Sequence, residues 1–193
     1  MLCIHHRINT IEALAAVPPA MGVELDIRSE GDHLILQHDP FQPGERFEDY
    51  LRQYRHAFMI LNIKAEGLEA PALELLRKYK VEHYFFLDLS FPALIQMIRK
   101  GERRLAVRFS EFEPLEACLA LKGKAEWVWV DCFKTMPLDA KNYAALKKDF
   151  KLCLVSPELQ HHPKEKIAEF KTQMTAFKLD AVCTKFPELW QNA

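Results

Sequence analysis

The sequence predicts a single-domain α/β protein over residues 1–193, a compact (β/α)8 TIM barrel with short loops. Short apolar runs alternate regularly with segments whose apolar residues lie three and four positions apart, as strands alternate with helices in βα units. Runs such as FFLDL and WVWVDC are apolar at nearly every position, which is typical of parallel strands buried on both faces. Almost every run ends in a charged or imidazole side chain, and such strand ends form the ligand-binding edge of parallel α/β folds.

The apolar runs predict nine strands. These strands cover residues 2–6, 22–28, 34–38, 58–64, 84–89, 105–109, 127–132, 152–156 and 180–184. Helical spacing predicts helices between them, at residues 10–17, 47–54, 70–79, 92–100, 115–121, 140–149 and 164–177, with a short last helix from Pro187 onward.

The second and third strands differ from the rest, because only residues 29–33 separate them and Glu30-Gly31-Asp32 is turn material. We therefore expect a hairpin-like excursion there and not a βαβ crossover. If the pair counts as one barrel strand with an extension, eight βα units remain. Barrels usually have about 250 residues, so the loops of this chain must be short. An open doubly wound sheet with fewer strands is the alternative.

Composition limits the class of protein. With 193 residues and 49% hydrophobic content the chain can bury one substantial core. The formal net charge of -1, with both signs interspersed, argues against a general nucleic-acid binder but leaves room for a local anion pocket. The composition leaves the oligomeric state open.

Cysteine usage and hydropathy predict a cytoplasmic protein. The five cysteines form no CxxC pair, so we expect reduced thiols that act as small core residues. No apolar stretch approaches the roughly 20 residues that span a bilayer. Met1 to Cys3 enters a strand directly, which leaves no room for a signal peptide.

Side chains at the strand ends have the chemistry of phosphodiester cleavage. Glu24 and Asp26 lie two apart on a strand, so both face the same side and are able to share a divalent cation. His6 and His38 can supply a general base and a general acid, because imidazole titrates nearest neutral pH. Arg7 can hold phosphate oxygens in a forked contact.

Lys64, at the end of the strand predicted over residues 58–64, adds a positive point charge for the phosphate that Arg7 can hold. An acid, a base and a cation together are what cleavage of a phosphodiester requires. A structural interpretation is also open, in which Glu24 and Asp26 only form ion pairs with Arg28, Lys64 or Arg108.

The segments HHR at 5–7, GVELDIR at 22–28 and LILQHDP at 34–40 resemble, in order and spacing, the glycerophosphodiester phosphodiesterase family of the phosphatidylinositol phospholipase C-like barrel superfamily. The family's strand ending His-Arg-Gly and its helix opening Glu-Asn-Thr are matched by His6-Arg7 and Asn9-Thr10. Its Glu-x-Asp and His-Asp motifs are matched by Glu24 with Asp26 and by His38-Asp39. LNIKAEG at 61–67 and AVCTKFP at 181–187 extend the likeness along the chain.

The resemblance implies a phosphoric diester hydrolase of lipid metabolism, with a small-molecule phosphodiester as the expected partner. It implies that His6 and His38 are the acid/base pair, that Arg7 and Lys64 bind phosphate, and that Glu24 and Asp26 are metal ligands. Further candidates lie at the ends of later strands. These are Arg108 and Lys185 for the phosphate, and Asn62, Asp88 and Asp131 as additional metal ligands. Attack by a substrate hydroxyl or by water is equally compatible with these residues.

The chain departs from the family pattern at three places. Ile8 replaces the glycine after His-Arg, and the closing Thr-Asp is Thr184-Lys185. The third-strand Glu-x-Lys has two possible registers, in which either Asn62 or Lys64 takes the place of the acidic metal ligand. The cofactor is accordingly Mg²⁺ or Ca²⁺, or no metal at all with the Lys64 ammonium in the cation position. A diverged barrel that binds phosphate or sugar phosphate, linked to polysaccharide assembly, is the alternative function.

Overall fold

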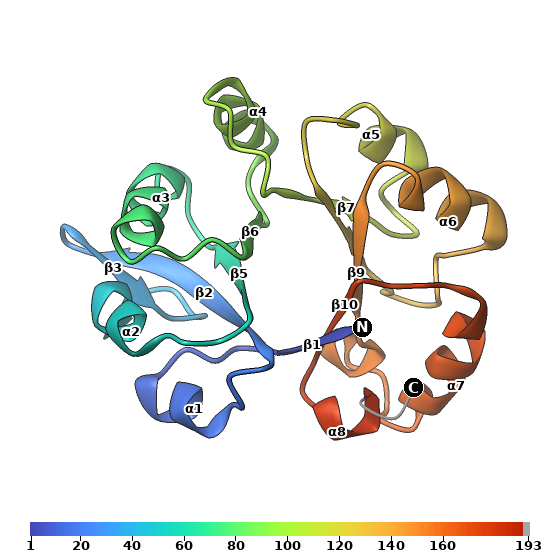
Figure 1. Cartoon of the computed structure of the whole chain (residues 1–193), viewed down its shortest axis with the longest axis horizontal. Helices are drawn as coiled ribbons and strands as arrows, with labels where there is room; N and C mark the ends of the chain where they lie inside the picture. The colour runs from blue at the N-terminus through green and yellow to red at the C-terminus, as the bar shows by residue number, and fades with distance from the viewer. Residues whose placement is uncertain (191–193) are drawn as a thin grey trace. The chain divides into compact units, whose positions relative to one another are not determined.

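The computed structural model describes residues 1–190 and shows a mixed α/β fold (Figure 1). The chain divides into two compact units. The N-terminal unit is His6–Glu102, and the C-terminal unit is Met1–His5 together with the chain from Arg103 onward. Each unit is described by itself.

The N-terminal unit is built on five strands in the order β4-β3-β2-β5-β6. The strands are β2 (Gly22–Glu30), β3 (His33–Leu36), β4 (Glu45–Arg46), β5 (Phe58–Ile63) and β6 (Tyr84–Leu87). β2, β5 and β6 are parallel, whereas β2–β3 and β3–β4 are antiparallel. The helices of this unit are α1 (Ile11–Ala16), α2 (Phe47–Gln53), α3 (Glu69–Lys78) and α4 (Phe91–Arg99).

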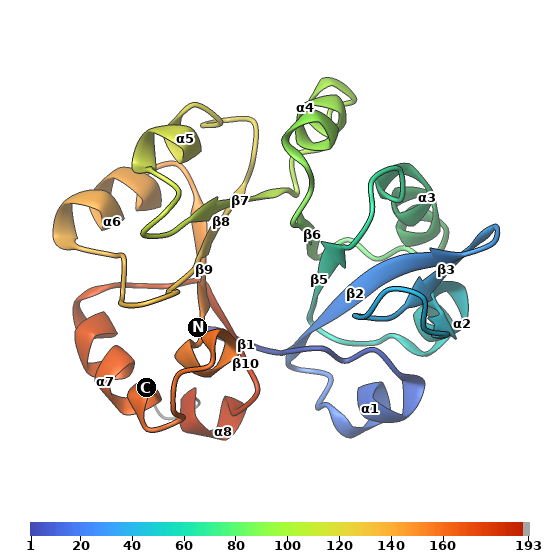
Figure 2. The ribbon, with the colours of Figure 1, turned by 180° about the vertical axis from the view of Figure 1, so that it is seen from behind.

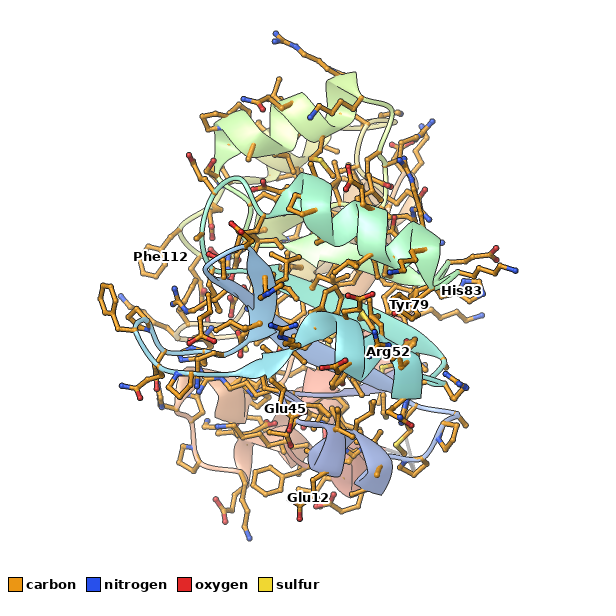
Figure 3. All side chains as sticks on the ribbon, turned by 90° about the vertical axis from the view of Figure 1, so that its left-hand side faces the viewer. Glu12, Glu45, Arg52, Tyr79, His83 and Phe112 are labelled. Carbon is orange, nitrogen blue, oxygen red and sulfur yellow. The ribbon has the colours of Figure 1, made fainter. Side chains whose placement is uncertain are left out.

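Side chains of α2 contact Tyr79, the residue that directly follows α3, and so connect these two helices. Arg52 and Tyr79 lie next to each other in Figure 3, and Arg52 Nε donates to Tyr79 Oη at 3.2 Å. Tyr79 Oη in turn donates to Glu48 at 2.9 Å. Glu45 connects β4 to α1. Its Oε2 accepts the N–H of Ile11 at 2.7 Å, one of the first N–H groups of the helix, which have no partner within the helix.

The C-terminal unit contains five parallel strands in the order β1-β10-β9-β8-β7. They are β1 (Leu2–His5), β7 (Ala106–Phe109), β8 (Trp127–Val130), β9 (Lys151–Val155) and β10 (Ala181–Thr184). The helices are α5 (Leu115–Leu119), α6 (Ala140–Lys147), α7 (Lys166–Gln173) and α8 (Pro187–Trp190), with 3₁₀ turns at Pro157–Gln160 and Met174–Ala176. Figure 2 shows α5, α6 and α7 along one side of this sheet.

Most predicted elements are confirmed within one to three residues, and so is the β2–β3 hairpin. Two differences stand out. β4 was not predicted, because two residues carry no periodicity, and the helix predicted over 164–177 is divided between α7 and a 3₁₀ turn. β3 ends at Leu36, two residues short of His38, and a loop with Pro40, Pro43 and Gly44 follows. A proline cannot donate to a sheet ladder, so the strand cannot continue through this loop.

Burial agrees with the composition. In the N-terminal unit Phe47 and Tyr50 of α2 are fully buried together with Leu25, Met59 and Phe85 of the strands. All five cysteines are free and buried, as predicted. Among residues 1–190 no helix is long and apolar enough to cross a membrane.

Candidate active site

The paired strands β2 and β5 position the acidic residues at the centre of the candidate site. Glu24 and Asp26 alternate with Leu25 on β2, so their side chains share one face of the sheet, as predicted. Asp26 lies opposite Asn62 in the parallel register of β2 and β5. Both carboxylates are buried, with exposed fractions of 1% for Glu24 and 0% for Asp26. Such buried charges are stable only with polar partners.

Glu24 is held by groups from two segments, the turn after β1 and strand β5. Its Oε2 accepts the Arg7 backbone N–H at 2.8 Å and lies 3.8 Å from His6 Nε2. Its Oε1 accepts from Asn62 Nδ2 at 3.1 Å. Burial, together with the neighbouring Asp26 carboxylate, raises the pKa of Glu24 to about 7. The group therefore changes charge close to physiological pH.

Asp26 has one fixed oxygen and one available oxygen. Oδ2 accepts from Asn9 Nδ2 at 2.8 Å, and the Asp26 N–H donates to Asn9 Oδ1 at 2.9 Å, so these two residues bind each other twice. Oδ1 lies 3.1 Å from Lys64 Nζ but makes no hydrogen bond of good geometry. The predicted structural alternative is thus partly present, because Asp26 pairs with Lys64, while Arg28 contacts neither acid.

Arg7 and His6 lie in the turn that follows β1. Arg7 has a left-handed backbone with φ 55°, which is uncommon for a residue with a side chain. In this conformation the Arg7 N–H meets the Glu24 carboxylate and the next N–H, of Ile8, donates to the Glu24 carbonyl oxygen at 2.8 Å. The His6 side chain is 14% exposed. The turn therefore places the His6 imidazole beside the Glu24 carboxylate.

His38 is oriented on both of its ring nitrogens. Arg7 Nη2 donates to His38 Nε2 at 2.6 Å, and the other nitrogen, Nδ1, lies 2.8 Å from Asp39 Oδ1. A guanidinium can only donate and a carboxylate can only accept, so the partners assign the proton to Nδ1 and the lone pair to Nε2. The hydrogen bond with His38 lowers the pKa of Asp39, which keeps this carboxylate ionised.

Arg28 fixes the backbone that carries His38. Its Nε and Nη2 donate to the His38 carbonyl oxygen at 3.0 and 2.8 Å, and Nη1 lies 3.5 Å from the Lys64 carbonyl oxygen. The Arg28 guanidinium thereby links the residues that follow β3 and β5, the two strands on either side of β2. This contact explains how His38 is positioned although β3 has already ended.

The predicted divalent ion has few suitable ligands in this arrangement. Within residues 1–190 no three His, Cys, Asp or Glu side chains are grouped as a metal site. Asn62 turns its amide nitrogen, a donor, toward Glu24, and an ammonium group stands beside Asp26. Calcium takes six to eight oxygen ligands, so the donor set present here does not fit such an ion. The sequence prediction of Mg²⁺ or Ca²⁺ stays a prediction.

Three of the other candidates, Arg108, Asp131 and Lys185, lie in or directly after strands of the C-terminal unit. The fourth, Asp88, lies in the N-terminal unit. Arg108 donates to Asp131, and Asp131 Oδ1 also accepts from Gln160 at 2.7 Å. The Lys185 side chain is exposed and its N–H donates to Glu158 Oε1 at 2.9 Å. Asp88, in the N-terminal unit, directly follows β6 with an exposed side chain and a left-handed φ of 57°. Their predicted roles stay predictions.

Sequence reasoning missed the positioning residues Asn9, Arg28 and Asp39. Asn9 was interpreted only as part of a helix opening, although its amide binds Asp26. Arg28 continues the alternation of Glu24 and Asp26 on β2, which was a usable signal that it faces the same side. Asp39 was noted in the His-Asp pair without a role.

Comparison with known proteins gives a fold and no sequence match. Neither a scan against protein-family models nor a search of curated proteins matches this sequence. Among solved structures, glycerophosphodiester phosphodiesterase from Agrobacterium tumefaciens strain C58 is similar with a TM-score of 0.72 at 16% identity, covering 100% of this chain and 99% of that chain. The chain shares the fold of a glycerophosphodiester phosphodiesterase.

A second solved structure agrees with the first. A glycerophosphoryl diester phosphodiesterase from Parabacteroides distasonis matches with a TM-score of 0.66 at 12% identity, over 95% of this chain and 82% of that chain. Identities this low concern the fold alone. The resemblance noted in the sequence motifs and the fold likeness nevertheless point to the same group of proteins.

Proposed function

We propose that this protein is a phosphodiester hydrolase of the glycerophosphodiester phosphodiesterase type. Two independent lines support the proposal. The first is the likeness of the whole chain to solved phosphodiesterases. The second is the gathering of His6, Arg7, Glu24, His38 and Lys64 in one compact unit. Contacts link the first four of these residues to one another, and Lys64 pairs with Asp26.

In this proposal Arg7 and Lys64 hold the phosphate. Arg7 offers a forked set of donors to two phosphate oxygens, and Lys64 contributes a compact positive charge. Neutralising the phosphate lowers the barrier to nucleophilic attack, because charge accumulates on its oxygens in the transition state. Arg7 exchanges its contact with His38 Nε2 for the phosphate, which leaves that nitrogen available for proton transfer.

His38 is the proposed general base and His6 the proposed general acid. His38 Nε2 takes the proton from the attacking hydroxyl, while Asp39 stabilises the imidazolium through Nδ1–H. His6 then donates a proton to the oxygen of the departing alcohol. Glu24 Oε2 lies 3.8 Å from His6 Nε2, so an acidic group stands beside the proposed acid. The orientation of His38 by Asp39 and Arg7 is the observation that carries this assignment.

We propose that the Lys64 ammonium supplies the positive charge for which the family pattern implies a divalent ion. Its support is the 3.1 Å distance from Lys64 Nζ to Asp26 Oδ1 and the donor face that Asn62 presents to Glu24. Turnover is therefore expected to persist in EDTA. Loss of turnover in EDTA with recovery on addition of Mg²⁺ or Ca²⁺ would contradict this part of the proposal.

Hydrolysis of glycerophosphocholine by matched variants tests the function. We expect His38→Ala and His6→Ala each to lower kcat by about 100-fold to 10,000-fold, the usual contribution of a general acid or base. His33→Ala is the control, because His33 is an exposed histidine of the same hairpin. Binding of phosphodiesters without product release in the wild-type protein would replace the hydrolase by a phosphate-binding protein.

We also propose that the strands close into the eight-stranded barrel that the sequence predicts. The match to the Agrobacterium tumefaciens phosphodiesterase over 99% of its length supports this topology. A crystal structure that traces the order of strands around the whole sheet tests the proposal, and an open sheet would contradict it.

A further inference from the structure

Beside the candidate active site, the N-terminal unit contains a pocket of about 540 Å³ that the proposed catalytic residues do not use. Its walls come from the outer part of the β2–β3 hairpin, the loop after β3, and the residue that follows Lys64. Its lining combines apolar and polar residues, which are Ile35, Pro40, Phe41, Pro43 and Ala65 on one hand and Arg28, Ser29, Glu30 and Gln42 on the other. Pockets for small molecules typically have volumes of roughly 300–1,000 Å³ and mainly apolar walls.

The pocket adjoins the backbone of two residues of the candidate active site, His38 and Lys64. Ala65 directly follows Lys64, and Pro40 lies two residues after His38. Arg28 lines the pocket and at the same time donates two hydrogen bonds to the His38 carbonyl oxygen. This adjacency through Arg28 is the reason to assign the pocket to one of the two ester groups of a phosphodiester.

Phe41 is the most unusual residue of the pocket. Its side chain is 101% exposed, the highest value among the exposed large hydrophobic residues of the structure. Its backbone is left-handed with φ 61°, a region that bulky side chains rarely adopt. Exposure and backbone conformation are both unfavourable in the free protein. Such costs are typical of residues that act on a ligand.

The loop that carries Phe41 is held in place by its own contacts. Gln37 Nε2 donates to the Pro43 carbonyl oxygen at 2.9 Å, and Gln37 Oε1 accepts the Asp39 N–H at 3.2 Å. A side chain at Gly44 would place its Cβ 2.4 Å from the Leu36 carbonyl oxygen, so only glycine fits there. These contacts constrain the backbone of the loop on both sides of Phe41.

We propose that this pocket binds the apolar part of the alcohol in the substrate, so that the preferred phosphodiesters carry an alkyl, acyl or aryl group. This inference rests on the proposed function, because it names the substrate class of the same site. Ile35, Pro40, Phe41 and Pro43 offer apolar surface to such a group. A small polar alcohol such as glycerol would lose hydrogen bonds to water there without gaining partners.

Calorimetric titration with two phosphocholine esters tests the proposal. Hexylphosphocholine and glycerophosphocholine share the phosphate and the choline group and differ in the apolar chain. The wild-type protein is expected to bind hexylphosphocholine about tenfold more tightly, the ratio that burial of about two methylene groups gives. Equal affinity for the two esters would overturn the proposal.

Substitutions assign the preference to the pocket. Phe41→Ala is expected to weaken binding of hexylphosphocholine about fivefold to tenfold and to leave glycerophosphocholine within about twofold. Ala65→Phe fills the pocket and should have the same selective effect. Phe91→Ala is the matched control, because Phe91 is a 65% exposed phenylalanine of the same unit outside the pocket. Weakening of both esters by Phe41→Ala, or of neither, would contradict the inference.

Turnover separates this inference from the proposed function. If the wild-type protein hydrolyses both esters without preference, the pocket assignment fails and the hydrolase stands. If it hydrolyses neither but binds hexylphosphocholine in a manner that depends on Phe41, the hydrolase fails and the pocket stands.

Discussion

Buried polar side chains are arranged differently in the two units. In the N-terminal unit several buried oxygens have no hydrogen-bond partner. Among residues 1–190 such side-chain oxygens belong to Asp26, Tyr50, Tyr54, Asn62 and Glu69, all of them in this unit. Native proteins rarely leave buried polar atoms unsatisfied, so each instance calls for an explanation.

The C-terminal unit arranges comparable groups into closed networks. Asp131, which is fully buried, accepts from Arg108, from Gln160 and from the Cys132 N–H. Glu158 similarly accepts from Thr184 Oγ1 at 2.6 Å and from the Lys185 N–H at 2.9 Å. Nearly every polar atom of these carboxylates is used inside the protein, which is typical of a network that stabilises the fold.

This difference in hydrogen bonding between the two units indicates where a ligand is expected. A buried carboxylate whose oxygens are all bonded contributes to stability and offers little to a substrate. Asp26 Oδ1, which lies 3.1 Å from Lys64 Nζ, and Asn62 Oδ1 are instead buried without hydrogen bonds of their own. This comparison favours the N-terminal unit as the source of the chemistry, and the following experiments test it.

The largest effect on stability is expected in the C-terminal unit. Asp131→Ala leaves Arg108 with a part-buried charge and removes the acceptor of Gln160, so we expect a loss of about 3–5 kcal/mol in the free energy of unfolding. Urea denaturation measures it. Asp149→Ala, which breaks a surface pair with Lys122 at 2.9 Å, should cost at most about 1 kcal/mol. Similar losses in both variants would show that the Asp131 network is not structural.

The pH dependence of stability should depend on Glu24. The unfolded chain loses this proton near its ordinary value of 4.5, whereas the folded protein keeps it until about pH 7. Between these values the folded state binds more protons, so stability falls as the pH rises, by up to about 3 kcal/mol. Urea denaturation from acid to neutral pH measures this decrease.

Glu24→Gln is the control for the pH effect, because the amide has no proton to lose. Asp39 and Glu111 have lowered pKa values and act in the opposite direction, with stability lost as the pH falls. The difference between the wild-type and variant curves therefore isolates Glu24. A difference that does not change with pH would contradict the raised pKa.

Asn62→Asp should make the N-terminal unit a binding site for divalent ions. Above about pH 7 the new carboxylate repels Glu24, with an expected loss of about 1–2 kcal/mol in the free energy of unfolding. Millimolar Ca²⁺ should restore this loss by joining three carboxylates, and it should shift the Tm of the wild-type protein much less. An equal shift in the wild-type protein would mean that its own residues already bind the ion.

Asn9→Ala should give the smallest change in stability, about 1 kcal/mol, because water can replace the half-buried amide. Its effect on turnover should be larger, since Asp26 loses the partner that fixes its orientation. Thr10→Ala is the matched control: it removes the N-cap of α1, also worth about 1 kcal/mol, and leaves Asp26 untouched. Equal kcat values in the two variants would exclude a positioning role for Asn9.

Much of the fold could be predicted because periodicity is a local property of the sequence. The parallel strands were visible as apolar runs, and Glu30-Gly31-Asp32 marked the hairpin. β4 was not predictable in the same way. Its two residues are defined by pairing with Ile35 and Leu36, and no local pattern encodes such a partner.

The candidate site could be predicted only as a set of residues. Strand alternation placed Glu24 and Asp26 on one face, and the motifs selected His6 and His38. The choice between the two registers of Asn62 and Lys64 needed coordinates, since both side chains approach the acidic pair, one at each carboxylate.

The sequence by itself determined which residues carry charge at the strand ends, because burial on both faces of parallel strands leaves a recognisable apolar pattern. Only the tertiary structure decided how those charges are used. It joined Asn9 to Asp26, Arg28 to the backbone of His38, and Asp131 to Gln160 across 29 positions of sequence. Hydrogen bonds depend on distance and angle in space, and residues far apart in the chain acquire these only when the backbone has folded.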